Sequence, residues 1–325
     1  MQTIFIVGPT AVGKTKLTLR LAALPWSNFS GIDILSVDSK QVFQDLNIVT
    51  GKDLDPFLKL EMLTYQSEEY LFYSKNNIRI FGIDLIPPDQ DWSVSHFIRY
   101  AEKIRKLSQS QDHLLVVVGG TGLYLESLVN PPETAFIPKN TVLRFEIDQF
   151  SVESLQGKLA SLNADRLAMM NNSDRQNKRR LVRAIEIEYW RRSNPDVSVK
   201  DAEYGWEGIW IGLKTSKEDL ESRIAMRVRE RLQHGAIDEV GRVCAKYPNL
   251  SQEARCTLGI KEIQLFLAEE ISETELDMLW KTHELQYAKR QITWFTHMPY
   301  INWLEANTDK LEEKAIKIIR EAGIL

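Results

Sequence analysis

Apolar residues in the first third of the chain follow two alternating patterns. Short runs of β-branched and aliphatic residues predict buried parallel strands at Thr3–Val7, Ile32–Val37, 78–86 and Leu114–Val118. Between these runs, apolar residues recur at helical spacing and predict helices over Lys14–Leu24 and Val94–Leu107. Strands that alternate with helices in this way predict an α/β fold, with a parallel sheet that has helices on both faces.

The pattern changes after residue 130. Prolines mark a loop there, and residues 141–192 show helical spacing without a convincing strand. A short apolar run at 208–213 predicts a strand that returns to the sheet, and we expect the remaining residues to be helical. The chain is therefore predicted to have three regions: an α/β core at 1–130, a helical insertion domain at 131–205, and a mainly helical return to the core at 206–325.

The first predicted strand runs into a glycine-rich segment, Gly8-Pro9-Thr10-Ala11-Val12-Gly13-Lys14-Thr15. It fits the phosphate-binding P-loop pattern GxxxxGK[ST] at every specified position and lies between a predicted strand and a predicted helix. The glycines let consecutive backbone N–H groups point into a concavity at the helix N-terminus, where the helix dipole and Lys14 favour a polyphosphate. Thr15 is placed to bring its hydroxyl to Mg²⁺. The segment predicts a phosphate site of the P-loop NTPase-like kind, but it does not identify the phosphate compound.

Asp38 follows the second predicted strand, at the edge of the sheet where open α/β folds bind their ligands. Three roles fit this position: a ligand of Mg²⁺, a general base, or the N-cap of a following helix. The strand at Leu114–Val118 ends in Gly119-Gly120-Thr121-Gly122, where an ordinary ATPase would carry an acidic residue. This difference favours a transferase that holds a diphosphate leaving group over a hydrolase.

Composition places limits on the class of protein. The chain is 43% hydrophobic and 26% charged, with a formal net charge of −4, so indiscriminate nucleic-acid binding is disfavoured. That average conceals residues 175–192, which hold seven Lys or Arg against two Glu. This segment is either a solvated helix surface or a surface that follows RNA phosphates. With only two cysteines, no secretory signal and no apolar run long enough to span a membrane, we expect a cytoplasmic monomer without membrane contact.

Five segments together resemble the tRNA dimethylallyltransferases, also called tRNA isopentenyltransferases. They are, in order, Gly8–Thr15, Asp38–Phe43, Gly119–Tyr124, Thr257–Glu262 and Gln286–Phe295. The resemblance runs from residue 3 to about residue 305. It implies transfer of a dimethylallyl group from dimethylallyl diphosphate to the exocyclic N6 amine of the adenosine immediately 3′ of the anticodon in tRNA.

The resemblance also implies roles for particular residues. The P-loop would hold the diphosphate, Thr15 would help to hold Mg²⁺, and Asp38 would accept the proton of the adenine amine. Lys14 and Arg223 would complete the catalytic set. By spacing alone, Arg223 and Arg227 with Arg231 form a stripe on a predicted helix over 217–234, which is also typical of a solvated face. The resemblance places Arg223 at the diphosphate and leaves Arg227 open between the two interpretations.

The expected partners are dimethylallyl diphosphate and a tRNA anticodon stem-loop. The residues expected to contact tRNA are Asp38, Ser39, Lys40, Gln41, Thr121, Arg144, Arg179, Arg180, Leu181, Val182, Arg183 and Arg290. Arg179 stands where the family usually has Gln, which could alter a base contact while keeping the charge. About thirty residues, 53–82, also replace a short link of the family. Within them, residues 54–77 are a lid, an added RNA contact or a surface elaboration.

Three other functions compete with this interpretation. An adenylate (AMP) isopentenyltransferase would share the chemistry, but a mononucleotide needs no arginine-rich helical insertion. A P-loop small-molecule kinase would fit the glycine-rich segment but not the other four segments. A nucleotide-dependent switch would need metal ligation by an acidic residue after the Leu114–Val118 strand, which the chain lacks.

Overall fold

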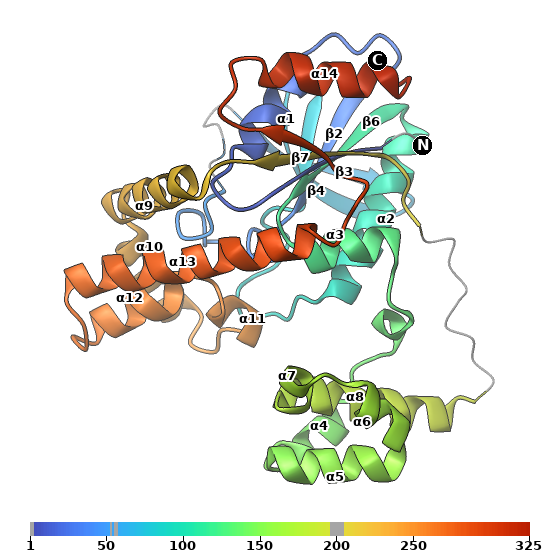
Figure 1. The fold of residues 1–325 in the computed structure, drawn as a ribbon, viewed down its shortest axis with the longest axis vertical. Coiled ribbons are helices and arrows are strands. Elements are labelled where there is room, and N and C mark those ends of the chain that lie inside the picture. The colour runs from blue at the N-terminus through green and yellow to red at the C-terminus, as the bar shows by residue number, and fades with distance from the viewer. Residues whose placement is uncertain (1–2, 53, 55–57, 196–204) are drawn as a thin grey trace. The chain divides into compact units, whose positions relative to one another are not determined.

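The computed structural model describes residues 3–52, 54, 58–195 and 205–325 (Figure 1). These residues form two compact units, one made of residues 1–129 together with 205–325 and the other of residues 130–204. No described helix is long and apolar enough to cross a membrane. The cytoplasmic location and the monomeric state stay predictions.

An eight-stranded sheet forms the centre of the larger unit, with the strand order β3-β4-β5-β2-β6-β1-β7-β8. The strands are β1 (Thr3–Val7), β2 (Gly31–Val37), β3 (Lys59–Tyr65), β4 (Glu68–Lys75), β5 (Ile78–Phe81), β6 (His113–Gly119), β7 (Ile209–Lys214) and β8 (Asn302–Glu305). From β5 to β8 in this order every pair is parallel, whereas the β3–β4 and β4–β5 pairs are antiparallel. The predicted parallel sheet is confirmed, and an antiparallel hairpin extends it at one edge.

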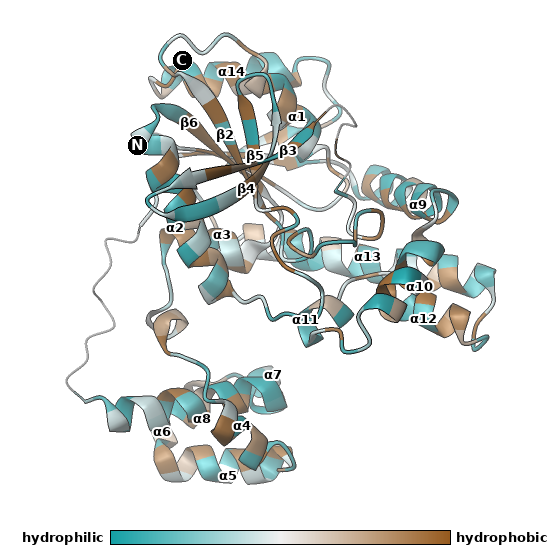
Figure 2. Ribbon diagram, turned by 180° about the vertical axis from the view of Figure 1, so that it is seen from behind, coloured by the Kyte–Doolittle hydropathy of each residue, from teal (hydrophilic) through white to brown (hydrophobic). Residues whose placement is uncertain are grey.

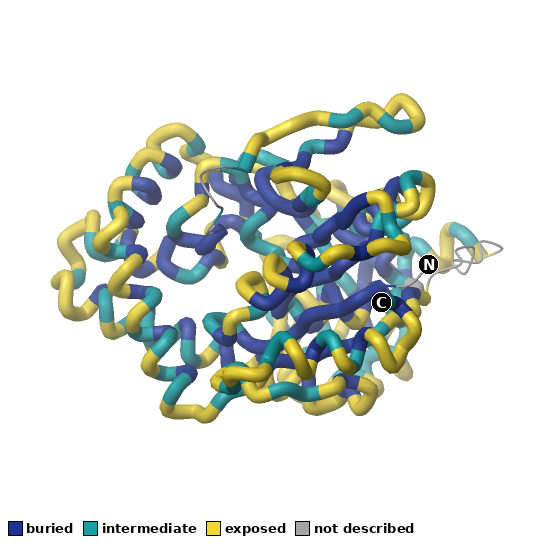
Figure 3. Tube along the Cα trace, turned by 90° about the horizontal axis from the view of Figure 1, so that it is seen from above, coloured by how far each residue is buried: buried dark blue, intermediate teal, exposed yellow. Residues whose placement is uncertain are grey.

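Helices cover both faces of this sheet because successive strand residues point to opposite sides. Ile4 and Ile6 of β1 pack with α1 (Lys14–Ala22) and α14 (Leu311–Glu321). On the opposite face, Phe5 and Val7 share a core cluster with α2 (Val94–Ser110) and α3 (Gly122–Val129). Apolar residues therefore concentrate on the central strands (Figure 2), and β1, β2 and β6 are buried along nearly their whole length (Figure 3).

The remaining helices of the larger unit follow β7. They are α9 (Lys217–Gln233), α10 (Ala236–Lys246), α11 (Gln252–Arg255), α12 (Ile260–Leu267) and α13 (Glu273–Phe295). Leu220 and Ile224 of α9 pack against Ala288 of α13, which holds these two helices together. Their polar residues are thereby brought towards the P-loop.

The smaller unit consists of short helices around their own apolar core. They are a 3-10 turn at Glu133–Phe136, then α4 (Thr141–Ile147), α5 (Val152–Leu162), α6 (Ala164–Met169), α7 (Asn172–Arg175) and α8 (Lys178–Ser193). Each of the five α-helices begins after an Asn or Ser whose side chain accepts a backbone N–H of the first turn. Leu155 and Leu159 of α5 pack against Leu181 and Ile185 of α8.

The structure corrects three details of the sequence-based prediction. The strand expected over 78–86 ends at Phe81, because Gly82 and Asp84 adopt positive φ angles of 90° and 56°. The hairpin of β3 and β4 lies inside 54–77, where no strand is predicted because exposed polar residues interrupt the apolar runs. The region after 213 is not wholly helical, since β8 pairs with β7. Four residues are too few for a recognisable strand pattern.

Candidate active site

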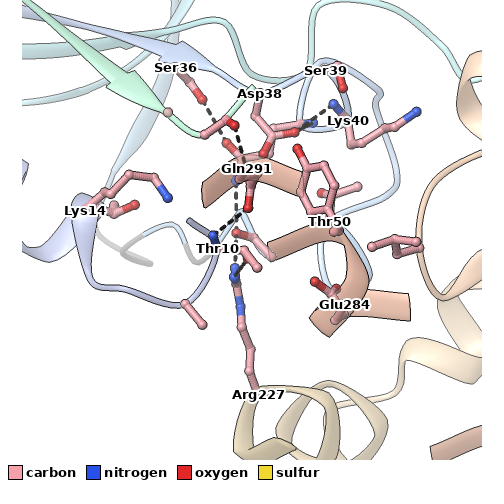
Figure 4. A pocket seen from close by; sticks show the side chains of 18 of the residues that line it. Thr10, Lys14, Ser36, Asp38, Ser39, Lys40, Thr50, Arg227, Glu284 and Gln291 are labelled. Carbon is pink, nitrogen blue, oxygen red and sulfur yellow. Dashed lines mark hydrogen bonds between the residues drawn. The ribbon is translucent and has the colours of Figure 1, made fainter. Parts of the chain in front are cut away.

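The carboxyl ends of three parallel strands meet at one edge of the sheet. Val7 of β1 and Val37 of β2 are both in register with Gly119 of β6. The residues that follow these strands therefore share this edge, where α/β folds place their ligands. A cavity of about 730 Å³ lies there, lined by residues that include Lys14, Thr15, Asp38, Gly120 and Arg227 (Figure 4).

The P-loop has the shape that its glycines allow. Gly8 and Gly13 have φ angles of 144° and 100°, and a Cβ on Gly8 would lie 2.5 Å from the carbonyl oxygen of Leu213. Helix α1 begins directly after Gly13 and has no side-chain cap. Its first backbone N–H groups are therefore suited to an anion at the cavity.

Lys14 lies half-buried beside the loop, and its Nζ donates a hydrogen bond of 2.7 Å to the carbonyl oxygen of Pro9. Burial, together with the charge of Arg227, lowers the pKa of Lys14 to about 7, and the charge of Asp38 opposes this shift. A bound polyanion would stabilise the ammonium form.

Two arginines one turn apart on α9 reach the P-loop. Arg227 donates from Nη1 to Oγ1 of Thr10 at 3.0 Å and from Nη2 to the carbonyl oxygen of Gly51 at 3.3 Å. Arg223 donates to the carbonyl oxygen of Val12 at 3.3 Å and lines a neighbouring cavity of about 480 Å³. The next residue of the stripe, Arg231, instead forms a buried ion pair with Glu284 at 2.7 Å. The stripe is therefore not simply a solvated face.

Gln291 of α13 is a buried residue that the sequence analysis does not assign to the site. Its Oε1 accepts the backbone N–H of Thr10 at 2.8 Å, and its Nε2 donates to the carbonyl oxygen of Gly120 at 2.9 Å (Figure 4). It thereby joins the P-loop to the end of β6. In the sequence, only its place in the Gln286–Phe295 segment links Gln291 to the site. Its partners lie 281 and 171 positions away, so no local pattern predicts these contacts.

Asp38 lines the cavity and also organises the turn that follows it. Its Oδ1 accepts the backbone N–H groups of Lys40 at 2.8 Å and Gln41 at 3.3 Å. No helix begins within the described residues 39–52, so Asp38 is not a helix N-cap; it holds a turn instead. This role is compatible with a chemical one, because the same bonds hold the carboxylate in place. Tyr287, also missed by the sequence analysis, lines the same cavity. Burial and the negative charge of Asp38 raise the pKa of Tyr287, which keeps its phenol neutral.

The other residues expected near Asp38 gather around this turn. The backbone N–H of Ser39 donates to Oγ1 of Thr121 at 3.4 Å, and Nζ of Lys40 donates to the carbonyl oxygen of Glu253 at 2.6 Å. Gln41 accepts a hydrogen bond from Ser36 at 2.9 Å and donates to the carbonyl oxygen of Gly51 at 3.0 Å.

Arg290, on α13, is exposed and lines the cavity. Its guanidinium lies 5.8 Å from the centre of the Tyr287 ring.

In the smaller unit, two of the expected RNA contacts hold the fold together. Arg144 forms an ion pair of 2.6 Å with the buried carboxylate of Glu186, and Arg183 bonds the same carboxylate at 3.1 Å. Arg183 also donates to the carbonyl oxygens of Thr134 and Ile137, each at 2.7 Å. These contacts give both arginines a structural role within the unit.

The remaining expected RNA contacts in this unit all belong to α8. Leu181 is fully buried, and Val182 is partly buried. Arg179 and Arg180 are exposed, with Arg180 paired to Asp174. The two exposed arginines are therefore the ones best placed to meet a partner.

Together, the P-loop after β1, its two arginines and the adjacent carboxylate of Asp38 define an α/β protein with a cavity suited to a phosphate compound. Residues 63–298 match the family model described as IPP transferase. The chain is 32% identical over 312 residues to the tRNA dimethylallyltransferase of Halothermothrix orenii, covering 94% of this chain and 88% of that relative. It is 30% identical over 336 residues to the tRNA dimethylallyltransferase of Carboxydothermus hydrogenoformans, with coverage of 99% and 98%.

A solved structure supports the same assignment. The full-length tRNA isopentenylpyrophosphate transferase from Bacillus halodurans superimposes with a TM-score of 0.66 at 26% identity, covering 99% of this chain and 96% of that one. The chain belongs to the IPP transferase family.

Gly120→Ala tests the contact between Gln291 and the P-loop. A Cβ at this position would overlap Nε2 of Gln291 and lie 3.0 Å from the carbonyl oxygen of Gly8, so Gln291 must leave its partners. We expect pyrophosphate to bind about tenfold more weakly, as the loss of buried hydrogen bonds predicts, when measured by isothermal titration calorimetry. Gly157→Ala is the control, because a Cβ there meets nothing within 4 Å. Equal affinities for the two variants would contradict the role of Gln291.

The lowered pKa of Lys14 predicts a pH dependence of anion binding. Lys14 is charged below its pKa of about 7 and loses its proton above it, so its contribution to pyrophosphate affinity should fall as the pH rises. The fall should approach tenfold for each pH unit. The ratio of the dissociation constants of Lys14→Met and the wild type isolates this contribution, because the ionisation of pyrophosphate affects both proteins equally. A ratio that stays constant from about pH 6 to about pH 9 would rule out a pKa near 7.

Proposed function

We propose that this protein transfers a dimethylallyl group from dimethylallyl diphosphate to the N6 amine of the adenosine immediately 3′ of the anticodon in tRNA, releasing diphosphate. The observation that carries the proposal is the single cavity in which the P-loop and Arg227 lie beside Asp38, in a chain of the IPP transferase family. The named relatives at 30% and 32% identity are tRNA dimethylallyltransferases, which supports this choice of reaction.

The P-loop half of the cavity would bind the diphosphate of the donor. Negative charge develops on the diphosphate as the bond between carbon and oxygen breaks, and donors fixed in advance stabilise that charge best. The N–H groups at the start of α1, Lys14 and Arg227 are such donors. Arg223 supports the loop from the neighbouring cavity through the carbonyl oxygen of Val12.

Asp38 would act on the acceptor. An adenine amine is a poor nucleophile because its lone pair is delocalised into the ring, so a carboxylate that accepts its proton helps the new bond to form. The backbone N–H groups of Lys40 and Gln41 hold this carboxylate in position before the substrate arrives. Ser39, Thr121 and Arg290 lie near enough to contribute contacts to the nucleotide.

Mg²⁺ would suit this site if the diphosphate supplied most of its ligands. Among the described residues, no three His, Cys, Asp or Glu side chains gather into a metal site. Mg²⁺ commonly takes one or two protein ligands and completes its shell with phosphate oxygens and water. The hydroxyl of Thr15 lines the cavity and would hold the ion together with the diphosphate, where it would neutralise charge on the leaving group.

Asp38→Asn tests the proposed base. The asparagine oxygen can still accept the bonds from Lys40 and Gln41, so the turn should survive while proton transfer is lost. We expect transfer to an anticodon stem-loop to slow by at least ~10²-fold, with little change in RNA affinity. Mass spectrometry of the digested nucleosides measures the rate, and Asp89→Asn, which changes an exposed carboxylate, serves as the control.

Full activity of Asp38→Asn would show that Asp38 is not the proton acceptor.

The same assay separates the alternative functions. Prenylated AMP without prenylated RNA would indicate an adenylate isopentenyltransferase. Turnover of ATP without prenyl transfer would indicate a kinase or a nucleotide switch.

The exposed arginines of α8 are proposed to bind the phosphates of the anticodon stem. Reversing the charge at Arg179 and Arg180 should weaken RNA binding and make its salt dependence shallower, because fewer counterions are released. Arg183 is left unchanged because it holds Glu186. The double variant Lys314→Glu/Lys317→Glu on exposed positions of α14 changes the net charge equally and controls for it. A salt slope equal to that of the control would refute the contact.

A further inference from the structure

The β3–β4 hairpin, whose role the sequence leaves open, is connected to the loop that forms one wall of the cavity. Tyr73 of β4 donates from its hydroxyl to Oδ2 of Asp84 at 2.6 Å. The other carboxylate oxygen of Asp84 pairs with Nζ of Lys52. Lys52 and Asp84 are both buried, so this contact is shielded from water.

Lys52 uses its remaining donors to hold the chain before it. Its Nζ donates to the carbonyl oxygen of Phe43 and to Oδ1 of Asn47, each at 2.8 Å. An ammonium group has three donors, and Asp84, Phe43 and Asn47 account for three hydrogen bonds. The segment from 43 to 52 is thereby closed into a loop around the Lys52 side chain.

Part of the wall of the substrate cavity belongs to this loop. Val49, Thr50 and Gly51 line it, and the carbonyl oxygen of Gly51 accepts the hydrogen bond from Arg227. Gly51 has a φ of 59°, and a Cβ there would overlap the guanidinium of Arg227. A displacement of the loop would therefore move Arg227, which also bonds Thr10 of the P-loop.

We propose that Tyr73, Asp84 and Lys52 are positioning residues through which the β3–β4 hairpin sets the place of Gly51 and Arg227 at the diphosphate side of the cavity. A further cavity of about 500 Å³ supports this connection, since Tyr73, Lys52 and Arg227 all line it. The inference rests on the proposed function only in naming the diphosphate as that of a prenyl donor. The hairpin then supports the binding site and is not merely a surface elaboration.

The contacts that run from Tyr73 through Asp84 to Lys52 are called the relay below, and Tyr73→Phe tests them with the smallest possible change. The variant removes only the hydroxyl and leaves the buried ion pair between Asp84 and Lys52 in place, so the protein should fold. We expect the dissociation constant of pyrophosphate and the KM of dimethylallyl diphosphate to rise about threefold to tenfold. The affinity for the RNA stem-loop should stay unchanged, and hydrogen exchange of the amides at 47–51 should become faster.

Tyr70→Phe is the matched control on the same strand. It also loses one hydroxyl, but that hydroxyl bonds Glu68 at 3.2 Å, a residue of the same hairpin. A Tyr73→Phe protein that binds pyrophosphate as Tyr70→Phe does, whatever its melting temperature, would overturn the relay. If the wild type binds pyrophosphate but transfers no prenyl group, the proposed function fails. The comparison of pyrophosphate affinities between Tyr73→Phe and Tyr70→Phe still tests the relay in that case.

Discussion

The concentration of positive charge at the end of β1 is the constraint on which the rest of the site depends. Burial and the charge of Arg227 together lower the pKa of Lys14 to about 7. Asp38 offsets part of this charge, but its Oδ1 is already held by two backbone N–H groups. A bound diphosphate would relieve the repulsion between the two cations, so the folded chain is prepared for an anion before one arrives.

Keeping that charge in place requires supports from distant parts of the chain. Gln291 of α13 joins Thr10 to Gly120, and Arg227 of α9 joins Thr10 to Gly51. Three of these four bonds end on backbone groups at the cavity, and the fourth ends on the hydroxyl of Thr10. The loops therefore gain a defined position from side chains that helices hold, as a preorganised site needs.

The arginines of the smaller unit divide into two kinds that composition alone does not separate. Arg144 and Arg183 surround the buried carboxylate of Glu186, so removing them would leave an unpaired buried charge. Arg179 and Arg180 are exposed on α8. A count of basic residues treats these four alike, although only Arg144 and Arg183 hold a buried carboxylate.

The parallel strands, the phosphate loop after β1 and the position of Asp38 after β2 can all be predicted from the sequence. These features follow from local apolar periodicity and from a motif of eight consecutive residues. The folded structure was needed to show that Gln291 and Tyr287 reach the cavity and that Arg183 contacts buried Glu186. It was also needed to show that β8 and the β3–β4 hairpin extend the sheet. These outcomes depend on contacts between residues far apart in the chain, as between Gln291 and Thr10, which leave no periodic pattern in the sequence.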